Sequence, residues 1–252
     1  MIVSSSTKKP KIHSSAYVAP SATISGDVTI GADCAVLHGA ILVAEGAPLT
    51  VGAETVVMEN AVLKASGGSA ISFPLAIGNR CIVGPQAYVV GATVGNGCFI
   101  ASGAKVFNGA TMEDGSGVAL GGIVHVNTRL GKGASVPMQH IALGNPAKIY
   151  SPDKAAEAQA QLNFYADVFN IEGTDDVRAQ AAQTYAKFLR KTHAQDKTLN
   201  EHKNVTPPPR RGEEPPPTQS ADVGGVVDAM MLELQEMEHR RQEALKKQAK
   251  KK

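Results

Sequence analysis

Residues 94–136 read VGNGCFIASGAKVFNGATMEDGSGVALGGIVHVNTRLGKGASV, and every sixth position in this stretch holds an aliphatic residue. The positions are Val94, Ile100, Val106, Met112, Val118, Val124, Leu130 and Val136. The same period occurs near the N-terminus, at Ile12, Val18, Ile24, Ile30, Val36 and Leu42. A period of six matches neither an amphipathic helix nor an alternating strand. The chain is therefore composed of short repeats.

Two further positions of each hexad indicate a sharp turn after a short strand. The third residue after the aliphatic one is of a type that tolerates positive φ: Asp27, Asp33, Gly39, Asn60, Gly97, Gly103, Gly109, Gly115, Gly121, Asn127 or Gly133. The fourth is small or β-branched: Ala16, Ala22, Val28, Cys34, Ala40, Thr55, Ala61, Cys81, Ala87, Cys98, Ala104 or Ala110. This pattern predicts an all-β solenoid, a left-handed parallel β-helix of hexapeptide repeats, followed by C-terminal α-helices.

The composition divides the chain into segments of different character. We expect a disordered arm over 1–10, a β-helix domain over 11–150, helices packed on the solenoid over 151–200, a proline-rich linker over 201–224, and a basic C-terminal helix or tail over 225–252. The repeat is interrupted by a phase slip after Leu42 and by a loop from Lys64 to Leu75. Loops excluded from a solenoid commonly carry the functional site or a subunit contact.

Helix signals follow the repeat. Ser151 and Pro152 predict the start of a helix that runs to about Phe169 and is broken near Gly173. Thr174 is expected to cap a second helix that ends near Thr192. One face of this second helix is apolar and is expected to dock on the solenoid: Val177, Ala181, Tyr185, Phe188 and Leu189. The segment from Val226 onward is either a weak coiled coil or a solvated single helix.

The charge of the chain is balanced overall and uneven locally. The net charge of +2 does not indicate nucleic-acid binding by the whole molecule. Residues 239–252, however, hold seven Lys or Arg against one acidic residue, Glu243, a balance of +6. We therefore expect a weak contact of this segment with a polyanion or an acidic partner.

The cysteines and the N-terminus bear on the compartment. Cys34, Cys81 and Cys98 all occupy the small inward-facing position, so buried free thiols are expected, and their spacing matches no zinc pattern. Free thiols fit a reducing compartment. The N-terminal stretch MIVSSSTKKPK holds no long apolar run, so neither a signal peptide nor a transmembrane segment is expected, and a cytoplasmic location is predicted.

Residues 26–150 contain a characteristic order of features: GDVTIG at 26–31, the phase slip, the excluded loop, IGNRCIVGPQA at 77–87, VVGATVGNG at 89–97 and LGNPAK at 143–148. In this order of features the segment resembles the gamma-class carbonic anhydrase family. It implies a homotrimer with zinc at each subunit interface, held by three histidines from two chains. In such a site a zinc-bound water titrates near neutrality and hydrates carbon dioxide.

The residues at the family's three zinc-ligand positions are not histidines in this chain. Lys64, Pro85 and Val90 stand where the family has its three histidines, Val43-Ala44-Glu45 stands for an RGD stretch, and Met58-Glu59 stands for a Gln-Asp pair. An ammonium group, a proline ring and an isopropyl group offer no zinc ligand. We therefore expect no zinc and predict no cofactor. The homotrimer is expected to form through the segments 43–45, 58–64 and 85–90.

Several side chains remain candidates for chemistry. Lys64 either forms a salt bridge with Glu59 that replaces the metal as a contact between subunits, or has a lowered pKa and acts chemically. His125 and His140 are candidate general bases for acyl transfer, and each has an alternative interpretation as a surface or interface histidine. His38 lies two residues after Val36 and has the same two interpretations. The sequence shows no serine–histidine arrangement.

Three functions stay open at this point. The first is a gamma-carbonic-anhydrase-like trimer that has lost zinc-dependent hydration and serves binding or assembly, or acts on an unidentified small ligand. The second is an acyl-coenzyme A-dependent hexapeptide acyltransferase, which the closing GNPAK segment and the excluded loop favour. The third is a structural subunit similar to the hexapeptide proteins at the pointed end of dynactin, which GDVTIG and FPLAIG (73–78) resemble.

Overall fold

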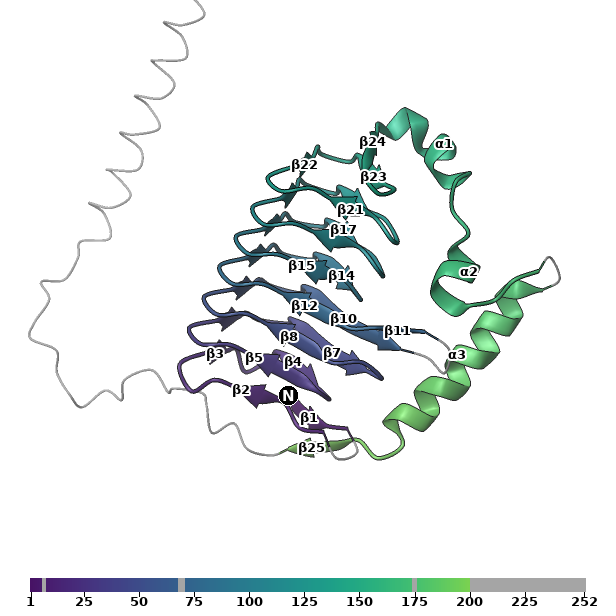
Figure 1. Cartoon of the computed structure of the whole chain (residues 1–252). Coiled ribbons are helices and arrows are strands. Elements are labelled where there is room, and N and C mark those ends of the chain that lie inside the picture. Colours follow the sequence, from purple (N-terminus) through teal and green to yellow (C-terminus); the bar gives the residue numbers. More distant parts are fainter. Residues whose placement is uncertain (6–7, 68–70, 174–175, 200–252) are drawn as a thin grey trace, which may run out of the picture. The chain divides into compact units, whose positions relative to one another are not determined.

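The computed structural model describes residues 1–5, 8–67, 71–173 and 176–199 (Figure 1). These residues belong to one compact unit formed by residues 1–206. The linker over 201–224, the predicted C-terminal helix and the basic segment 239–252 lie outside the described residues, and so does the predicted cap Thr174. No described helix is long and apolar enough to cross a membrane.

The described strands form three sheets, which are the faces of a parallel β-solenoid. The first sheet consists, in spatial order, of β24 (Lys148–Tyr150), β23 (Ile141–Leu143), β20 (Ile123–Val124), β17 (Lys105–Val106), β14 (Tyr88–Val90), β10 (Val62–Gly67), β7 (Ile41–Glu45), β4 (Thr23–Ser25), β1 (Ile2–Ser4) and β25 (Lys197–Leu199), with β11 (Ser72–Phe73) paired to β10. The second consists of β2 (Lys11–Ile12), β5 (Val28–Ile30), β8 (Leu49–Val51), β12 (Leu75–Ile77), β15 (Thr93–Val94), β18 (Thr111–Met112) and β21 (Arg129–Leu130). The third consists of β22 (Ser135–Val136), β19 (Gly117–Val118), β16 (Phe99–Ile100), β13 (Ile82–Val83), β9 (Val56–Val57), β6 (Ala35–Val36) and β3 (Tyr17–Val18). This is the predicted left-handed parallel β-helix of hexapeptide repeats.

The aliphatic residues of the repeat stack inside the solenoid. Val106 pairs in register with Val124 on the next coil, and neither side chain has exposed surface. Burial of this kind along every coil supplies the hydrophobic stabilisation of a narrow core that lacks large aromatic residues. The three cysteines are buried and free, as predicted.

The predicted positive-φ corners are confirmed with one exception. All of the expected third positions adopt positive φ except Asp27, where the left-handed residue is instead Gly26 (φ 84°). A Cβ atom at Gly26 would lie 2.7 Å from the carbonyl oxygen of Ala44, so the next coil leaves no room for a side chain. The sequence pattern missed four more corners, at Glu54, Arg80, Gln86 and Gln139.

Both interruptions of the repeat project from the same sheet. Strand partners on regular coils are 18 residues apart, as Lys105 and Ile123 are, whereas Ile41 pairs with Val62 and Val62 pairs with Tyr88. The extra residues lengthen β7 and β10 beyond the other strands of the first sheet, and β11 folds back on β10. The phase slip and the excluded loop are thus confirmed, and together they form one projecting edge (Figure 1).

Residues 1–10 differ from the expected disordered arm. Ile2–Ser4 form β1, which pairs in parallel with β4 and antiparallel with β25. The physical reason is that β4 would otherwise end the sheet with unpaired backbone groups, and β1 satisfies them.

The segment after the solenoid forms several helices instead of the predicted pair. A short 3-10 helix (Pro152–Lys154) leads into α1 (Ala155–Gln159), and α2 (Phe164–Phe169) follows after a break. The continuous helix expected up to Phe169 is therefore wrong, because Asn163 starts a new helix by accepting a hydrogen bond from the Ala166 N–H group. The second predicted helix is confirmed as α3 (Val177–His193), which runs beside the projecting edge (Figure 1).

Candidate functional site

Lys64 lies in the projecting part of β10, beside the other elements of the site. Its register partners are Val43 on β7 and Val90 on β14. Two of the three positions that hold zinc ligands in the resembling family, Lys64 and Val90, are therefore neighbours on adjacent strands of this chain. Pro85 lies apart from them, at the corner between β13 and β14, where its carbonyl accepts a hydrogen bond from the Gly103 N–H group. Lys64, which stands at the first of these positions, faces α3.

A buried polar cluster joins Lys64 to α3. The Lys64 Nζ atom lies 2.7 Å from Glu45 Oε2 and donates to the Tyr185 hydroxyl at 2.8 Å. The Tyr185 hydroxyl in turn donates to Glu45 Oε2 at 3.0 Å. Only 11% of the Glu45 side chain and 21% of the Lys64 side chain are exposed. The three groups thus satisfy one another in a place that water reaches poorly.

The predicted partner of Lys64 is corrected by this geometry. Glu59 was expected to form the salt bridge, but the partner is Glu45, the residue at the acidic position of the family's RGD stretch. Glu59 lies at the turn between β9 and β10, where its carbonyl accepts a hydrogen bond from Gln86. The reason is the lengthened β7, which brings Glu45 alongside the end of β10.

The pKa of the Lys64 ammonium group is raised, whereas a catalytic amine needs a lowered pKa. Burial alone would lower the pKa of the Lys64 ammonium, but hydrogen bonds with Glu45 and Tyr185 outweigh burial and hold that pKa above its ordinary value. Burial also raises the pKa of the Tyr185 hydroxyl, with Glu45 adding to the effect. Lys64 therefore stays a paired cation near neutral pH, and the alternative of a lowered pKa is wrong.

His193, at the end of α3, extends the cluster. Its Nε2 atom lies 3.6 Å from Glu45 Oε1, and its Nδ1 atom lies 2.7 Å from Asp196 Oδ2. The other Asp196 oxygen, Oδ1, is buried without a hydrogen-bond partner. The middle and the C-terminal end of α3 therefore both contact Glu45 through polar side chains, Tyr185 and His193.

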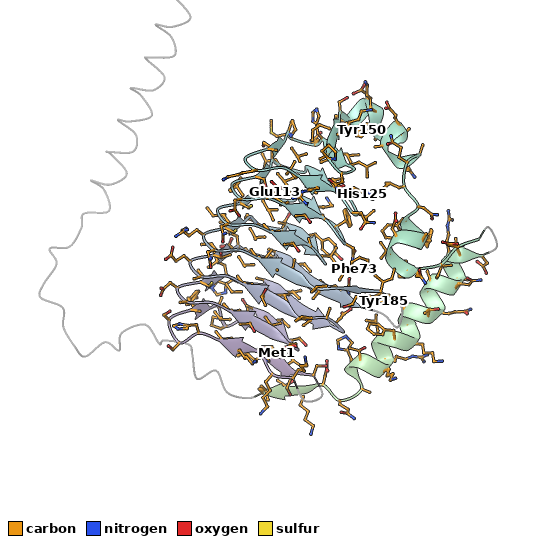
Figure 2. The ribbon with its side chains drawn as sticks, in the orientation of Figure 1. Met1, Phe73, Glu113, His125, Tyr150 and Tyr185 are labelled. Atoms are coloured by element: carbon orange, nitrogen blue, oxygen red, sulfur yellow. The ribbon has the colours of Figure 1, made fainter. Side chains whose placement is uncertain are left out.

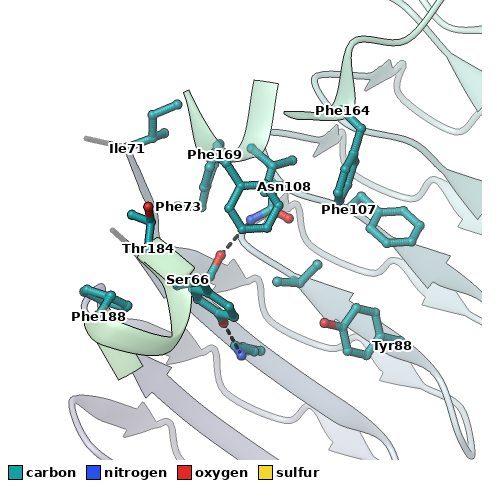
Figure 3. Close-up of a pocket in the computed structure, with 15 residues that line it drawn as sticks. Ser66, Ile71, Phe73, Tyr88, Phe107, Asn108, Phe164, Phe169, Thr184 and Phe188 are labelled. Carbon is teal, nitrogen blue, oxygen red and sulfur yellow. Dashed lines mark hydrogen bonds between the residues drawn. The ribbon is translucent and has the colours of Figure 1, made fainter. Parts of the chain in front are cut away.

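A cavity of about 270 Å³ lies between the first sheet and the helices, next to this cluster (Figure 3). Lys64 and Val90 are part of its lining, so two of the family's three ligand positions border the cavity. Nearly half of the lining residues are aromatic, and they come from β11, β14, the turn after β17, α2 and α3: Phe73, Tyr88, Phe107, Phe164, Phe169, Tyr185 and Phe188. In Figure 2 Phe73 is labelled at the solenoid strands and Tyr185 beside α3.

The histidine candidates do not gather into a site. His125 stacks on Phe107 with ring centroids 5.3 Å apart, and its Nδ1 atom accepts a hydrogen bond from the Val126 N–H group at 2.8 Å. The lone pair that a general base would use is therefore already engaged. The His140 ring contacts the Met138 carbonyl at 2.7 Å, and neither ring lines the cavity.

Two serine–histidine contacts are present that the sequence did not reveal. The first joins His13 Nδ1 to Ser15 Oγ at 2.9 Å, and the second joins Ser21 to His38. The Ser21 Oγ atom lies 2.8 Å from His38 Nδ1 on the neighbouring coil, and it also accepts a hydrogen bond from the Gly39 N–H group. Ser15 makes the same kind of contact with the Asp33 N–H group one corner earlier. Ser21 is thus one of a series of corner-capping side chains, on an exposed edge. Its pairing with His38 is part of the corner and has no third group to orient the ring.

Tyr185 and Asn108 are the site residues that sequence reasoning missed. Tyr185 was assigned to the apolar face of a helix, and its position there was itself a signal, since a buried tyrosine hydroxyl usually finds a partner. Asn108 is buried and donates to Ser66 Oγ at 2.7 Å on the cavity wall. Nothing in the hexad pattern distinguishes Asn108 from other corner residues.

The described residues do not offer a ligand set for the zinc that the resemblance implies. No group of three His, Cys, Asp or Glu side chains close enough to hold a metal ion occurs among them. At the family positions themselves the Lys64 amine is protonated and paired, and Val90 and Pro85 have no donor atom in their side chains. These residues do not fit the metal.

Fold and site together define a hexapeptide-repeat solenoid with a non-metal cluster at its projecting edge, and comparison with known proteins agrees with the resemblance. The chain is 30% identical over 193 residues to a protein named gamma carbonic anhydrase 1, mitochondrial, of Arabidopsis thaliana, covering 74% of this chain and 68% of that protein. It is 27% identical to gamma carbonic anhydrase 2, mitochondrial, of the same plant, covering 74% of this chain and 67% of that protein. The chain belongs to the gamma carbonic anhydrase family.

A solved hexapeptide transferase family protein from Anaplasma phagocytophilum is 21% identical, with a TM-score of 0.45, over 77% of this chain and 98% of that chain. No family profile matches the sequence.

Proposed function

We propose that this chain is a member of the gamma carbonic anhydrase family that has lost zinc-dependent hydration and serves a binding and assembly role. The observation that carries the proposal is the state of Lys64. At the first ligand position the ammonium group is paired with Glu45 and Tyr185, and its pKa is raised. A lysine binds zinc only as the neutral amine, so the cluster opposes metal binding beyond the loss of the other ligands.

The metal part of the proposal is tested by stoichiometry. The protein is purified, incubated with excess zinc and dialysed extensively, and the bound metal is measured by plasma emission or mass spectrometry. We expect far less than one zinc per chain. Zinc retained at one ion per chain, and lost in a Lys64→Met variant of unchanged fold, would contradict the proposal.

The outward residues of the three sheets support assembly into a trimer. On the second sheet they are mainly polar: Lys11, Thr29, Thr50, Ala76, Thr93, Thr111 and Arg129. On the third sheet they are mainly apolar: Tyr17, Ala35, Val56, Ile82, Phe99, Gly117 and Ser135. Tyr17, Ile82 and Phe99 are exposed in the single chain. Such an apolar row marks an interaction surface.

The first sheet also presents apolar residues, among them Ile41, which is exposed, and Ile123. A cyclic trimer joins two different faces of each copy in a head-to-tail contact. We therefore propose that the third sheet of one copy packs on the first sheet of the next, with the polar second sheet facing water. The contact would include 58–62 and 85–87. Glu45 and Lys64, expected at the interface, are instead engaged by α3, and Tyr88 lines the cavity beside the helices.

Light scattering of purified protein tests the assembly. Wild-type protein should have three times the mass of the chain, and Phe99→Glu should reduce it toward one chain because it places a charge in the apolar contact. Thr93→Glu is the matched control, since Thr93 is also an exposed strand residue but lies on the second sheet. A monomeric wild-type protein at micromolar concentration, or a trimeric Phe99→Glu variant, would contradict this arrangement.

The predicted cytoplasmic location remains a prediction, and the names of the two Arabidopsis relatives describe mitochondrial proteins. Fractionation of cells that express a tagged chain at natural level distinguishes the two compartments.

A further inference from the structure

The cavity beside Lys64 has two aromatic walls that do not touch each other through their rings. On the solenoid side Tyr88 and Phe107 are in contact, with centroids 6.2 Å apart. On the helix side Phe169 contacts both Phe164 and Tyr185, at 5.9 Å in each case. Among the described residues no ring contact joins the two walls (Figure 3). A gap between two such walls suits a flat apolar group, which gains face and edge contacts on both sides.

The polar groups of the lining are few and fixed in place. The Asn108 carboxamide is held by its hydrogen bond to Ser66 Oγ, and Thr184 of α3 lies at the rim. Gly91 lets Phe73 and Asn108 pack closely against the backbone, because a Cβ atom there would lie 2.4 Å from Phe73 Cβ and 2.8 Å from Asn108 Nδ2. An apolar pocket with a small number of placed polar groups is the usual form of a small-molecule site.

The charge of the lining restricts the ligand further. Among the described residues that line the cavity, Lys64 is the only charged one, and its ammonium group is already paired with Glu45. An anionic ligand would have to displace Glu45, which would leave a nearly buried carboxylate without its partner. The cavity therefore favours an uncharged molecule over bicarbonate, a carboxylic acid or a phosphate ester.

We propose that this cavity binds a compact, uncharged aromatic molecule with one hydrogen-bonding group, such as a phenol, an aryl amine or an indole. The inference rests on the proposed binding role and names its ligand class. The ring lies between the walls formed by Tyr88 with Phe107 and by Phe164 with Phe169, and the polar group faces Asn108. The volume of about 270 Å³ accommodates a molecule of one to three aromatic rings.

A matched pair of fluorescent probes tests the inference on the full chain. N-phenyl-naphthylamine is uncharged, and anilinonaphthalenesulfonate is the same molecule with an added sulfonate. Because the chain contains no tryptophan, probe emission is free of energy transfer from that residue. We expect saturable binding of the uncharged probe at one site per chain, with roughly tenfold weaker binding of the sulfonate. Equal or tighter binding of the sulfonate would overturn the inference.

Two variants on α3 locate the binding. Thr184→Phe fills the rim of the cavity and should weaken binding of the uncharged probe by roughly tenfold. Gln183→Phe is the control, because Gln183 is exposed on the same helix and does not line the cavity. Unchanged binding in Thr184→Phe, or no saturable binding in wild-type protein, would also overturn the inference. Neither result bears on zinc content, so failure here is distinct from failure of the proposed loss of hydration.

Discussion

Val106 illustrates what a single residue of the hexad ladder contributes. Its side chain has no exposed surface and lies between Val89 and Val124 of the neighbouring coils. Val106→Asp places an unpaired carboxylate there and should destabilise the fold by roughly 4 kcal/mol or more. Urea denaturation followed by circular dichroism measures the loss. Lys105→Asp, one residue away on the outward side, should cost less than about 1 kcal/mol. A stable, cooperatively unfolding Val106→Asp protein would show that the register is wrong.

His125 gives the solenoid a defined dependence on pH. Burial lowers the pKa of its imidazole from 6.5, and nearby Asp167 only partly offsets the effect. The folded protein therefore binds this proton less readily than the unfolded chain, so stability is full above about pH 6.5 and declines as the pH falls toward the lowered pKa. His125→Phe, which keeps a ring against Phe107, should remove this part of the decline. Melting temperatures measured across the range test it, and an identical decline in the variant would exclude His125 as the cause.

At the residue level the sequence predicted which side chains are buried better than it predicted which side chains pair with one another. The hexad period predicted which side chains are buried, because that pattern is local and repeats along the chain. It did not predict that Lys64 pairs with Glu45 instead of Glu59, because Glu45 belongs to the preceding coil. Its distance along the sequence from Lys64 depends on the length of the phase slip, which no local pattern specifies. The pairing of Ser21 with His38 was missed because the hexad pattern does not specify which side chains meet across neighbouring coils, and these two residues are 17 positions apart in the sequence.

At the scale of elements, the docking of α3 depends on the cluster that Tyr185 completes. Tyr185→Phe removes two hydrogen bonds to charged groups and keeps the ring contacts, so α3 should open more readily, by about 1 kcal/mol. Amide hydrogen exchange of residues 177–193 should then be roughly fivefold faster. Tyr165→Phe on α2 is the control, since the Tyr165 hydroxyl has no hydrogen-bond partner among the described residues. Unchanged exchange in Tyr185→Phe would show that the cluster does not hold the helix.

The sequence predicted some of these elements and missed others. Capping residues and the apolar face predicted α3, including the side that docks. The division near Asn163 was missed because Asn163 lies inside a stretch whose composition suits a helix. β1 was missed because its pairing with β4 and β25 is a tertiary interaction, and the short stretch Ile2–Ser4 carries no repeat signal of its own.

At the scale of the whole molecule, the basic segment 239–252 lies outside the described residues, and its role remains a prediction from charge. In a trimer it would be present three times, and tethered copies gain avidity for a polyanion without any new contact. Truncation after Val223 should leave the fold and the number of chains per particle unchanged. It should abolish retention on heparin at low salt. Equal retention of the truncated protein would show that the segment is not the binding element.

The solenoid of this family member is intact, whereas its ligand positions hold a paired lysine, a proline and a valine. The most direct test of the account is the initial rate of carbon dioxide hydration, measured by stopped flow with the full chain and added zinc. A variant with Lys64→His, Pro85→His and Val90→His together, in the same buffer, shows what restored ligands contribute. The account predicts that the wild-type rate equals the uncatalysed rate at every zinc concentration. A wild-type rate that rises with zinc and saturates at one ion per chain would contradict it.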